Sequence, residues 1–390
     1  MGDAVSPLER MAEAADDPAG YAARWKARTG SPAVGVLPMN FPAEIAHAAG
    51  VLPVVVQEDR NPITLGNNLL SEFNCGYSRN LADQAATGRL DVFDAVFMAD
   101  HCIQLIGAAD VIRELSDRPF HFGQLISSMN DPWTPEQVRL TLAGFVEEMS
   151  AFAGVEVTEE RLGRSIRAYN RGRRLLRRLY TDRRDGDARF GPTELQTIVK
   201  SSMVMQREEH TALLEELVAA SVPGARDGGR VRVHLSAHLC HAPKPELLEL
   251  IEESGGLVVD DDLFHGVRHV STDADEDRPP LDALVSQYLR RNVAVPCPTR
   301  AQSDVDWDSY LVDAVRRSGA EAVISLMVKY CEPHMLYLPE VRKRLDAEGV
   351  PHLLLETEHE GMPLETMRTR IEAMFEQVRL GRTRTHAASA

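Results

Sequence analysis

Short apolar segments alternate with helical patterns along most of this sequence. The apolar run Val34–Leu37 is followed by an amphipathic segment, Ala43–Ala49, and then by a second apolar run, Val54–Gln57. Apolar runs that are buried on both faces and connected by a helix are typical of parallel β-α-β units. The pattern returns after residue 228, where further strand–helix–strand units follow one another. Two such regions predict an α/β protein with two doubly wound domains.

The stretch between these two regions has a different character. It carries helix-start signals at Thr134 and Thr158, and a third helical pattern runs from about Gly191 to Leu217. We interpret this stretch as a helical insert without a sheet. The expected organisation is a helical lead-in over 1–30, an N-terminal α/β domain over 31–133, the helical insert over 134–222, a C-terminal α/β domain over 228–380 and a disordered tail over 381–390.

The charge of the chain limits the kinds of partner that it can have. Its net charge is −16, which disfavours nucleic acid and anionic membrane surfaces as partners. The run Arg171–Arg184 is the one strongly basic patch. Two interpretations of this run stay open, a solvated helix face and a contact for coenzyme phosphates or an acidic partner.

Several features favour the reducing cytoplasm as the location. No apolar run reaches the roughly 18 residues of a membrane-spanning helix, so none is expected. The N-terminal segment is acidic and lacks the apolar core of a signal peptide. The five cysteines are widely spaced and odd in number, which argues against a disulfide framework.

Common nucleotide-binding and nucleophile motifs are missing from the sequence. No GxGxxG follows the first strand, and neither a P-loop pattern, a CxxC pair nor a GxSxG elbow occurs. A nicotinamide site, a P-loop site and a zinc ribbon therefore have little or no support. The thiols remain as the most informative candidates for chemistry.

Three cysteines share a special placement. Cys75, Cys102 and Cys331 each precede a helical pattern and are expected beyond the carboxyl ends of strands, where ligands bind in open α/β sheets. A helix N-terminus favours the thiolate over the thiol, and the thiolate is the form that binds metal. Cys240 and Cys297 lie in proline-flanked turns and are interpreted as structural, with a role as a fourth ligand as the alternative.

Thiolates in this number point to soft metals. They select iron–sulfur clusters, zinc or cuprous copper, whereas any single cysteine is more often an inert buried residue. Iron–sulfur clusters are ordinarily held by four thiolates. A site with three would leave one iron open to substrate, water or a non-protein sulfur.

Longer segments resemble a known family. The chain resembles the 2-hydroxyacyl-CoA dehydratase / benzoyl-CoA reductase D-component family from about residue 31 to 380. The resemblance rests on the separated Cys75 and Cys102 and on four segments: PMNFPAEIAHAAGVLPV, IEESGGLVVDDDLFHGVR (Ile251–Arg268), VISLMVKYCEPHMLYLPEVRKRLDAEGVPHLLLETE and TRIEAMFEQ (Thr369–Gln377).

The resemblance implies a fold, a cofactor and a reaction. In this family two flavodoxin-like domains hold one [4Fe–4S] cluster per subunit, and the matching ligands here are Cys75, Cys102 and Cys331. A separate ATP-hydrolysing iron–sulfur activator injects one electron, which turns the thioester carbonyl of an acyl-CoA into a ketyl radical that expels water. The chain is thus expected to be the iron–sulfur subunit of a lyase. It lacks the activator's nucleotide motifs, so it is not expected to be the ATPase.

Other members of the family leave alternatives open. One is a benzoyl-CoA reductase-type subunit that dearomatises its substrate reductively. Another is a homodimer that shares a double-cubane [8Fe–9S] cluster and reduces small molecules, and a third is a subunit whose cluster only relays electrons. The expected partners are a paralogous subunit or a second copy of this chain, together with the activator and an acyl-CoA substrate.

The resemblance also directs attention to polar residues near the three cysteines. Candidates for proton handling are Glu332, His101, His334 and Glu358, and candidates for hydrogen bonds toward the cluster are Ser78 and Arg79, in the first turn after Cys75. Surface or helix-cap hydrogen bonding is the alternative explanation for each of them.

Overall fold

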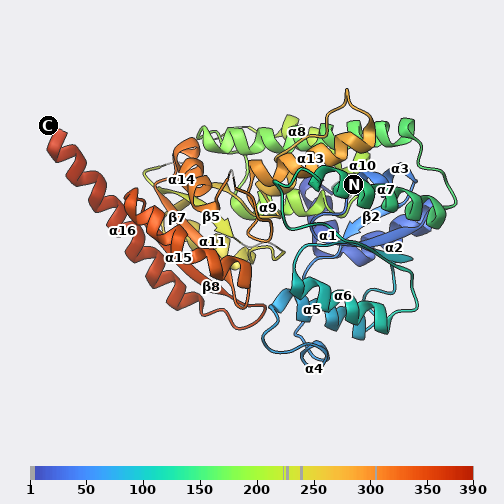
Figure 1. The fold of residues 1–390 in the computed structure, drawn as a ribbon. Helices are drawn as coiled ribbons and strands as arrows, with labels where there is room; N and C mark the ends of the chain where they lie inside the picture. Colours follow the sequence, from blue (N-terminus) through green and yellow to red (C-terminus); the bar gives the residue numbers. More distant parts are fainter. Residues whose placement is uncertain (1–4, 223, 225–227, 238–239, 304, 390) are drawn as a thin grey trace.

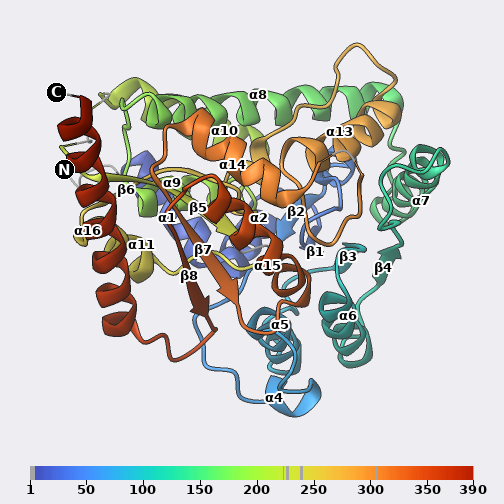
Figure 2. The same cartoon turned by 60° about the vertical axis from the view of Figure 1, so that its left-hand side comes forward.

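The computed structural model describes residues 5–222, 224, 228–237, 240–303 and 305–389, with side chains as far as Arg382. It contains two four-stranded parallel sheets (Figures 1 and 2). The first has the order β2-β1-β3-β4 and the second the order β6-β5-β7-β8. The strands are β1 (Ala33–Leu37), β2 (Leu52–Val55), β3 (Ala95–Ala99), β4 (Phe120–Gly123), β5 (Val231–Ala237), β6 (Gly256–Asp261), β7 (Ala322–Val328) and β8 (His352–Thr357). The predicted α/β class with two parallel sheets is confirmed.

Helices cover both faces of the first sheet. On β3, Val96 and Met98 face one hydrophobic cluster while Phe97 faces the other, as expected from the alternation of side chains along a strand. Helices α1 (Pro7–Asp16), α2 (Pro18–Thr29), α5 (Gly76–Ala86) and α6 (Ile103–Leu115) contribute to the first cluster, and α3 (Ala43–Ala48), α7 (Thr134–Ala153) and α13 (Pro280–Ala294) to the second. Helix α13 thus packs on the first sheet, although it lies in the sequence among the elements of the second.

The second sheet is covered in the same way. Val233 and Ile324 pack with α11 (Pro245–Glu253) and α16 (Leu364–Ser389). On the opposite face, Val323 and Val259 pack with α14 (Trp307–Ser318) and α15 (Glu332–Ala347). Two single-turn helices, α4 (Gly66–Leu69) and α12 (Val267–Val270), lie in connecting segments.

Each sheet with the helices that cover it forms one lobe of the molecule. The long helix α8 (Glu159–Arg184) joins the two lobes and runs along the top of the molecule in both views (Figures 1 and 2). Near its start Arg161 Nε donates to the Ala48 carbonyl oxygen of the first lobe (2.8 Å), and at its end Arg184 pairs with Asp260 of the second (2.7 Å). Along its length several arginines of the basic run pair with the chain's own carboxylates, namely Glu44, Asp273 and Glu276. These ion pairs give the basic run a structural role, because it fastens the helix to both lobes.

Two segments differ from their expected form. The helical pattern from about Gly191 to Leu217 is interrupted, giving α9 (Pro192–Ser201) and α10 (Arg207–Ala220). Within the interruption, the Met203 carbonyl oxygen accepts a hydrogen bond from Val55 N at the end of β2 (2.9 Å). At the other end, α16 continues to Ser389 through most of the segment 381–390, for which the sequence predicts disorder. Arg382 pairs there with Glu321 and anchors the helix, while Ala390 lies outside the described residues.

None of the helices in the described parts of the chain combines the length and the apolar character needed to cross a bilayer.

Candidate functional site

A cavity of about 220 Å³ lies where strands of both sheets end. Cys102 follows β3 of the first sheet, and Cys331 follows β7 of the second. Cys75, at the end of the long connection after β2, and Cys240, after β5, line the same cavity. The structure therefore brings together the three cysteines chosen from the sequence and adds a fourth thiol, whereas the buried Cys297 is not among the lining residues.

Each of the three cysteines stands at the start of a helix. Cys75 is the N-cap of α5, Cys102 of α6 and Cys331 of α15. None of them uses its side chain to cap the helix, and all three are half-buried and free of disulfides. The sulfurs are thus held at helix N-termini, where partial positive charge supports bound anions.

The side chain of Gln104 connects the three cysteine-bearing segments. Its Oε1 accepts a hydrogen bond from Cys75 N (2.5 Å), and its Nε2 donates to the Tyr330 carbonyl oxygen (2.6 Å), one residue before Cys331. Gln104 itself lies two residues after Cys102 in the first turn of α6. One amide therefore fixes the relative positions of loops that are more than 200 residues apart in sequence.

Three charged side chains form a chain of contacts beside Cys75: His241, Glu58 and His359. His241 interacts electrostatically with Cys75, and its Nδ1 lies 2.9 Å from Glu58 Oε2. The other oxygen of Glu58 contacts His359 Nδ1 at 2.5 Å. Burial alone would raise the pKa of Glu58, but the two histidines lower it, and the pKa of His241 is raised to about 10 against the effect of burial by Glu58 and Cys75.

The thiols differ in their readiness to ionise. Burial opposes ionisation of Cys75, yet its electrostatic interaction with His241 and the contact with Ser78 Oγ lower its pKa. Burial raises the pKa of Cys102 to about 12, and burial with the nearby Cys75 raises that of Cys331. The helix N-termini therefore do not suffice to ionise all three thiols in the free protein. A coordinated cation changes this balance, because a thiol that binds metal is deprotonated.

Both histidine candidates are buried beside the cysteines. His101 lines the cavity, and its Nδ1 lies 3.5 Å from Thr299 Oγ1, whereas its Nε2 has no hydrogen-bond partner among the described residues. His334 does not line the cavity, but its Nδ1 lies 3.2 Å from Cys331 Sγ and its ring packs edge-on against Trp307. Burial, followed by nearby arginines, lowers the pKa of His101 well below its usual value, and burial lowers that of His334 to about 3.

The other candidates lie at different distances from the cavity. Glu332 lines the mouth and is exposed. The buried Ser78 has its Oγ 3.3 Å from Cys75 Sγ. Arg79 and Glu358 are not among the lining residues; they form an ion pair at 3.2 Å, and Arg79 also donates to the Asn74 carbonyl oxygen. This pair ties the start of α5 to the segment after β8.

The donor set has the soft thiol character that an iron–sulfur cluster requires. Within the described ranges, no group of three or more His, Cys, Asp or Glu side chains is arranged to hold one ion. In a cubane cluster each thiolate binds a separate iron, so the sulfurs surround a volume instead of converging on a point. Three soft thiols around one cavity, with the unpartnered Nε2 of His101 in its wall, have this character.

Sequence reasoning missed His241, Glu58 and Gln104. Glu58 and His241 could have been found from the sequence, because each comes shortly after a strand segment and polar residues after parallel strands gather at one sheet edge. Gln104 carried none, since its partners belong to loops that only the tertiary structure brings together.

If the cavity holds the iron–sulfur cluster that the family resemblance implies, replacement of Gln104 by leucine is expected to weaken iron retention without preventing folding. The substitution removes both hydrogen bonds that join the three segments, and loss of such supporting contacts typically costs about 10–100-fold in metal affinity. The rate of iron release to a chelator, measured under anoxia, should rise at least tenfold, by the same reasoning. Gln137→Leu, at an exposed position on α7, is the control; equal release rates in the two variants would show that Gln104 does not support the site.

The comparisons with known proteins agree over nearly the whole chain. The family model described as 2-hydroxyglutaryl-CoA dehydratase, D-component, matches residues 38–378. The chain is 24% identical over 366 residues to the (R)-phenyllactyl-CoA dehydratase beta subunit of Clostridium sporogenes, covering 93% of this chain and 96% of the relative. It is 23% identical over 390 residues to a subunit of the benzoyl-CoA reductase of Thauera aromatica (97% and 98%). It is also 25% identical over 381 residues to the beta subunit of the lactoyl-CoA dehydratase of Anaerotignum propionicum (95% and 98%).

Proposed function

Because this chain belongs to the 2-hydroxyglutaryl-CoA dehydratase D-component family, we propose that it is the iron–sulfur subunit of a 2-hydroxyacyl-CoA dehydratase. The observation that carries the proposal is the meeting of Cys75, Cys102 and Cys331 at one cavity between the two sheets. Two of the three relatives described above are dehydratase subunits. A lyase is therefore favoured, and the similarity to the benzoyl-CoA reductase of Thauera aromatica supports a reductase-type subunit as the alternative.

The three cysteines would hold a [4Fe–4S] cluster. When bound, this cluster supplies one-electron transfer, which is the chemistry that a radical (ketyl) elimination of water from an acyl-CoA requires. We assign to this chain's residues the tasks of binding and proton handling. His101 Nε2, unpartnered among the described residues and buried at the cavity, is placed to hold a proton there, and the exposed Glu332 is placed to exchange protons with solvent.

The remaining candidates act through the cysteines. Ser78 and His334 hydrogen-bond to the sulfurs of Cys75 and Cys331, and hydrogen bonds to ligand sulfurs tune the potential of a cluster. Arg79 and Glu358 keep α5 in place through their ion pair. The strand order in both sheets is that of the first four positions of the flavodoxin-like order 2-1-3-4-5, which supports the flavodoxin-like description of both domains.

The mouth of the cavity is the surface on which we expect a partner subunit. Two of its lining residues are exposed apolar side chains, Ile103 (68% exposed) and Leu336 (78%). The exposed Met335 (50%) precedes Leu336 in α15, and the exposed Phe73 (66%) packs against Tyr330, next to Cys331. Clustered apolar side chains of this kind mark protein interfaces. The relatives carry the word subunit in their names, and we propose a second subunit of the same family as the occupant.

Aspartate at Ile103 or Leu336 is expected to break this assembly, because a charge in an apolar interface is costly to bury. The tagged chain, purified from its native host under anoxia, should carry a second D-component-type subunit that mass spectrometry identifies. Both variants should lose that subunit, whereas Leu140→Asp, at an exposed position on α7, should retain it. If all three variants retained the second subunit, the mouth of the cavity would not be the subunit interface.

The proposed reaction is tested by activity under strict anoxia. The assay combines the chain and its partner subunit with the ATP-hydrolysing activator, ATP and a panel of 2-hydroxyacyl-CoA and aromatic acyl-CoA esters. Formation of the 2-enoyl-CoA, dependent on ATP and activator, is the expected result. Reduction of an aromatic ring would favour the reductase alternative, and turnover without ATP would contradict the proposal.

A further inference from the structure

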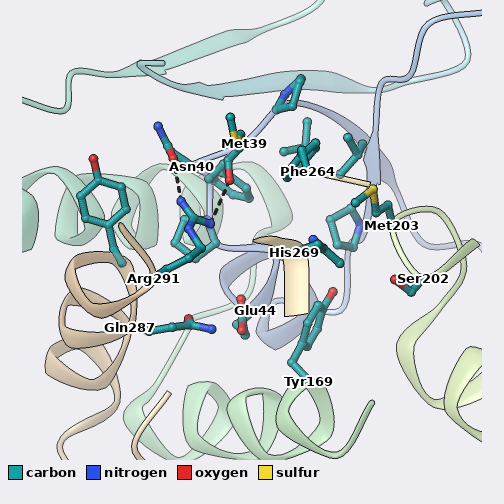
Figure 3. Close-up of a pocket in the computed structure, with 18 of the residues that line it drawn as sticks. Met39, Asn40, Glu44, Tyr169, Ser202, Met203, Phe264, His269, Gln287 and Arg291 are labelled. Carbon is teal, nitrogen blue, oxygen red and sulfur yellow. Dashed lines mark hydrogen bonds between the residues drawn. The ribbon is translucent and has the colours of Figure 1, made fainter. Parts of the chain in front are cut away.

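A second cavity, of about 80 Å³, lies beyond the ends of β1 and β2, and none of its lining residues lines the cysteine cavity. Its walls come from the segment after β1, from α8 and α13, and from the interruption between α9 and α10 (Figure 3). The volume admits a few water molecules or a small ion, because a water occupies about 10–15 Å³ on this measure. A coenzyme does not fit.

Three arginines line this cavity, whereas Glu44 is the one carboxylate among the lining residues. Glu44 is 1% exposed and pairs with Arg173. Arg207 and Arg291 also line the cavity, and neither forms an ion pair with a carboxylate of the described residues. Arginine is strongly unfavourable to bury without a counter-charge, so this excess of positive charge needs an explanation.

Arg207 is the most deeply buried of the three. It is 4% exposed, its Nη2 donates to the Ser202 carbonyl oxygen (2.8 Å), and its guanidinium lies 4.1 Å from the centre of the Tyr169 ring. Its Nε has no hydrogen-bond partner among the described residues. A charged donor is thus left unsatisfied in the wall of a cavity.

Arg291 reaches the same cavity from α13. Its Nη2 donates to Asn40 Oδ1 (2.7 Å) and its Nη1 to the Met39 carbonyl oxygen (3.2 Å), as the dashed lines in Figure 3 show. Burial lowers the pKa of Arg291 to about 10. Burial and the neighbouring arginines also lower the pKa of His269, which lines the same cavity, well below its usual value. Positively charged side chains therefore outnumber carboxylates among the described residues that line the cavity.

We propose that this cavity binds a small oxyanion, a carboxylate or a phosphate, through Arg207 and Arg291. Guanidinium groups match the geometry of both anions and form their strongest hydrogen bonds with them. The anion would satisfy Arg207 Nε and offset the charge that Glu44 leaves uncompensated. This inference does not depend on the function proposed above, because none of the residues involved lines the cysteine cavity.

Calorimetric titration of the full chain with sodium phosphate and, separately, sodium acetate tests the proposal. Sodium chloride keeps the ionic strength constant, so a general salt effect gives no saturable signal. We expect saturable binding of one anion per chain for at least one of the two, and the stronger of the two identifies the class. Absence of saturable binding by either anion would overturn the proposal.

Three variants test whether the anion binds in this cavity. Arg207→Met should weaken it at least tenfold, which corresponds to about 1.4 kcal/mol. Gln287→Glu keeps every arginine and places a competing carboxylate in the cavity wall, so it should weaken binding equally even where Arg207→Met fails to fold. Arg178→Gln, at an exposed position on the same α8, removes one positive charge elsewhere and should bind as the unmodified chain does. Unchanged affinity in Gln287→Glu would overturn the assignment.

Discussion

Anaerobically purified Cys331→Ala protein is expected to contain almost no iron and to lack the brown colour that the proposed cluster would give the unmodified chain. The assigned ligands are three cysteines, and with one of them replaced the cluster would be left with two thiolates from this chain. Cys331 is the N-cap residue of α15 and is the one assigned ligand from the second lobe. Its replacement therefore also removes the proposed connection, through the cluster, between the two lobes. Iron and sulfide content per chain, with the visible absorbance spectrum, measure the effect.

Cys240→Ala is the matched control and should keep the iron. Cys240 is buried, lines the same cavity and differs from Cys331 in that no described helix begins at it. The comparison separates two assignments, three ligands with an open iron and four ligands with Cys240 as the last. Full iron content in Cys331→Ala would refute the ligand assignment, and loss of iron in Cys240→Ala alone would make Cys240 the ligand.

Much of the fold was accessible from the sequence because its signals are local. The run Val34–Leu37 predicted β1 to within a residue, since strands buried on both faces must be almost wholly apolar. The predicted strand Val54–Gln57 begins two residues too late relative to β2. Pro53 interrupts the apolar pattern in the sequence but lies within β2. Because β2 is an edge strand of its sheet, proline is tolerated there.

Part of the candidate site could also be predicted from the sequence, because some of its signals are local. A cysteine that leads a helix after an apolar run is a local pattern, and it pointed to Cys102 and Cys331. The contacts that organise the site are not local. Glu58 meets His359 across 301 residues and Gln104 meets Tyr330 across 226, and a single sequence contains no record of such pairings. The packing of α13 on the first sheet escaped prediction for the same reason.

Loss of the Asp262 carboxylate is expected to destabilise the second lobe by about 3–5 kcal/mol, the usual cost of removing one partner from a buried charged network. Asp262 is 1% exposed. It accepts hydrogen bonds from Ser236 Oγ (2.7 Å), Ala237 N (2.8 Å) and Trp307 Nε1 (3.2 Å). The same Trp307 packs against His334, which contacts Cys331, so one carboxylate connects the end of β5 with the thiol.

The pH dependence of this contribution follows from two pKa shifts. Burial opposes ionisation of Asp262, but His234 and Arg268 lower its pKa, so its contribution is present above the unfolded value of about 3.9 and is lost as the pH falls. Burial lowers the pKa of His234, but the nearby carboxylates of Asp260–Asp262 raise it by more, so that the net shift is upward. The contribution of His234 to stability is therefore present below about pH 6.5 and is lost as the pH rises through the higher pKa of the folded state. The network should therefore stabilise most between about pH 4 and 6.5.

Urea unfolding of Asp262→Ala, Asp262→Asn and the unmodified chain at pH 5.5 and at pH 8 measures both effects. Asp262→Ala should lose the full amount at pH 5.5 and less at pH 8, because His234 contributes less to the unmodified chain there. Asp262→Asn keeps the shape but not the charge, so its stability should change less with pH than that of the unmodified chain. Asp313→Asn, at an exposed position on α14, should stay within about 0.5 kcal/mol. An Asp262→Ala variant as stable as Asp313→Asn would mean that the carboxylate does not hold β5, Trp307 and the Cys331 segment together.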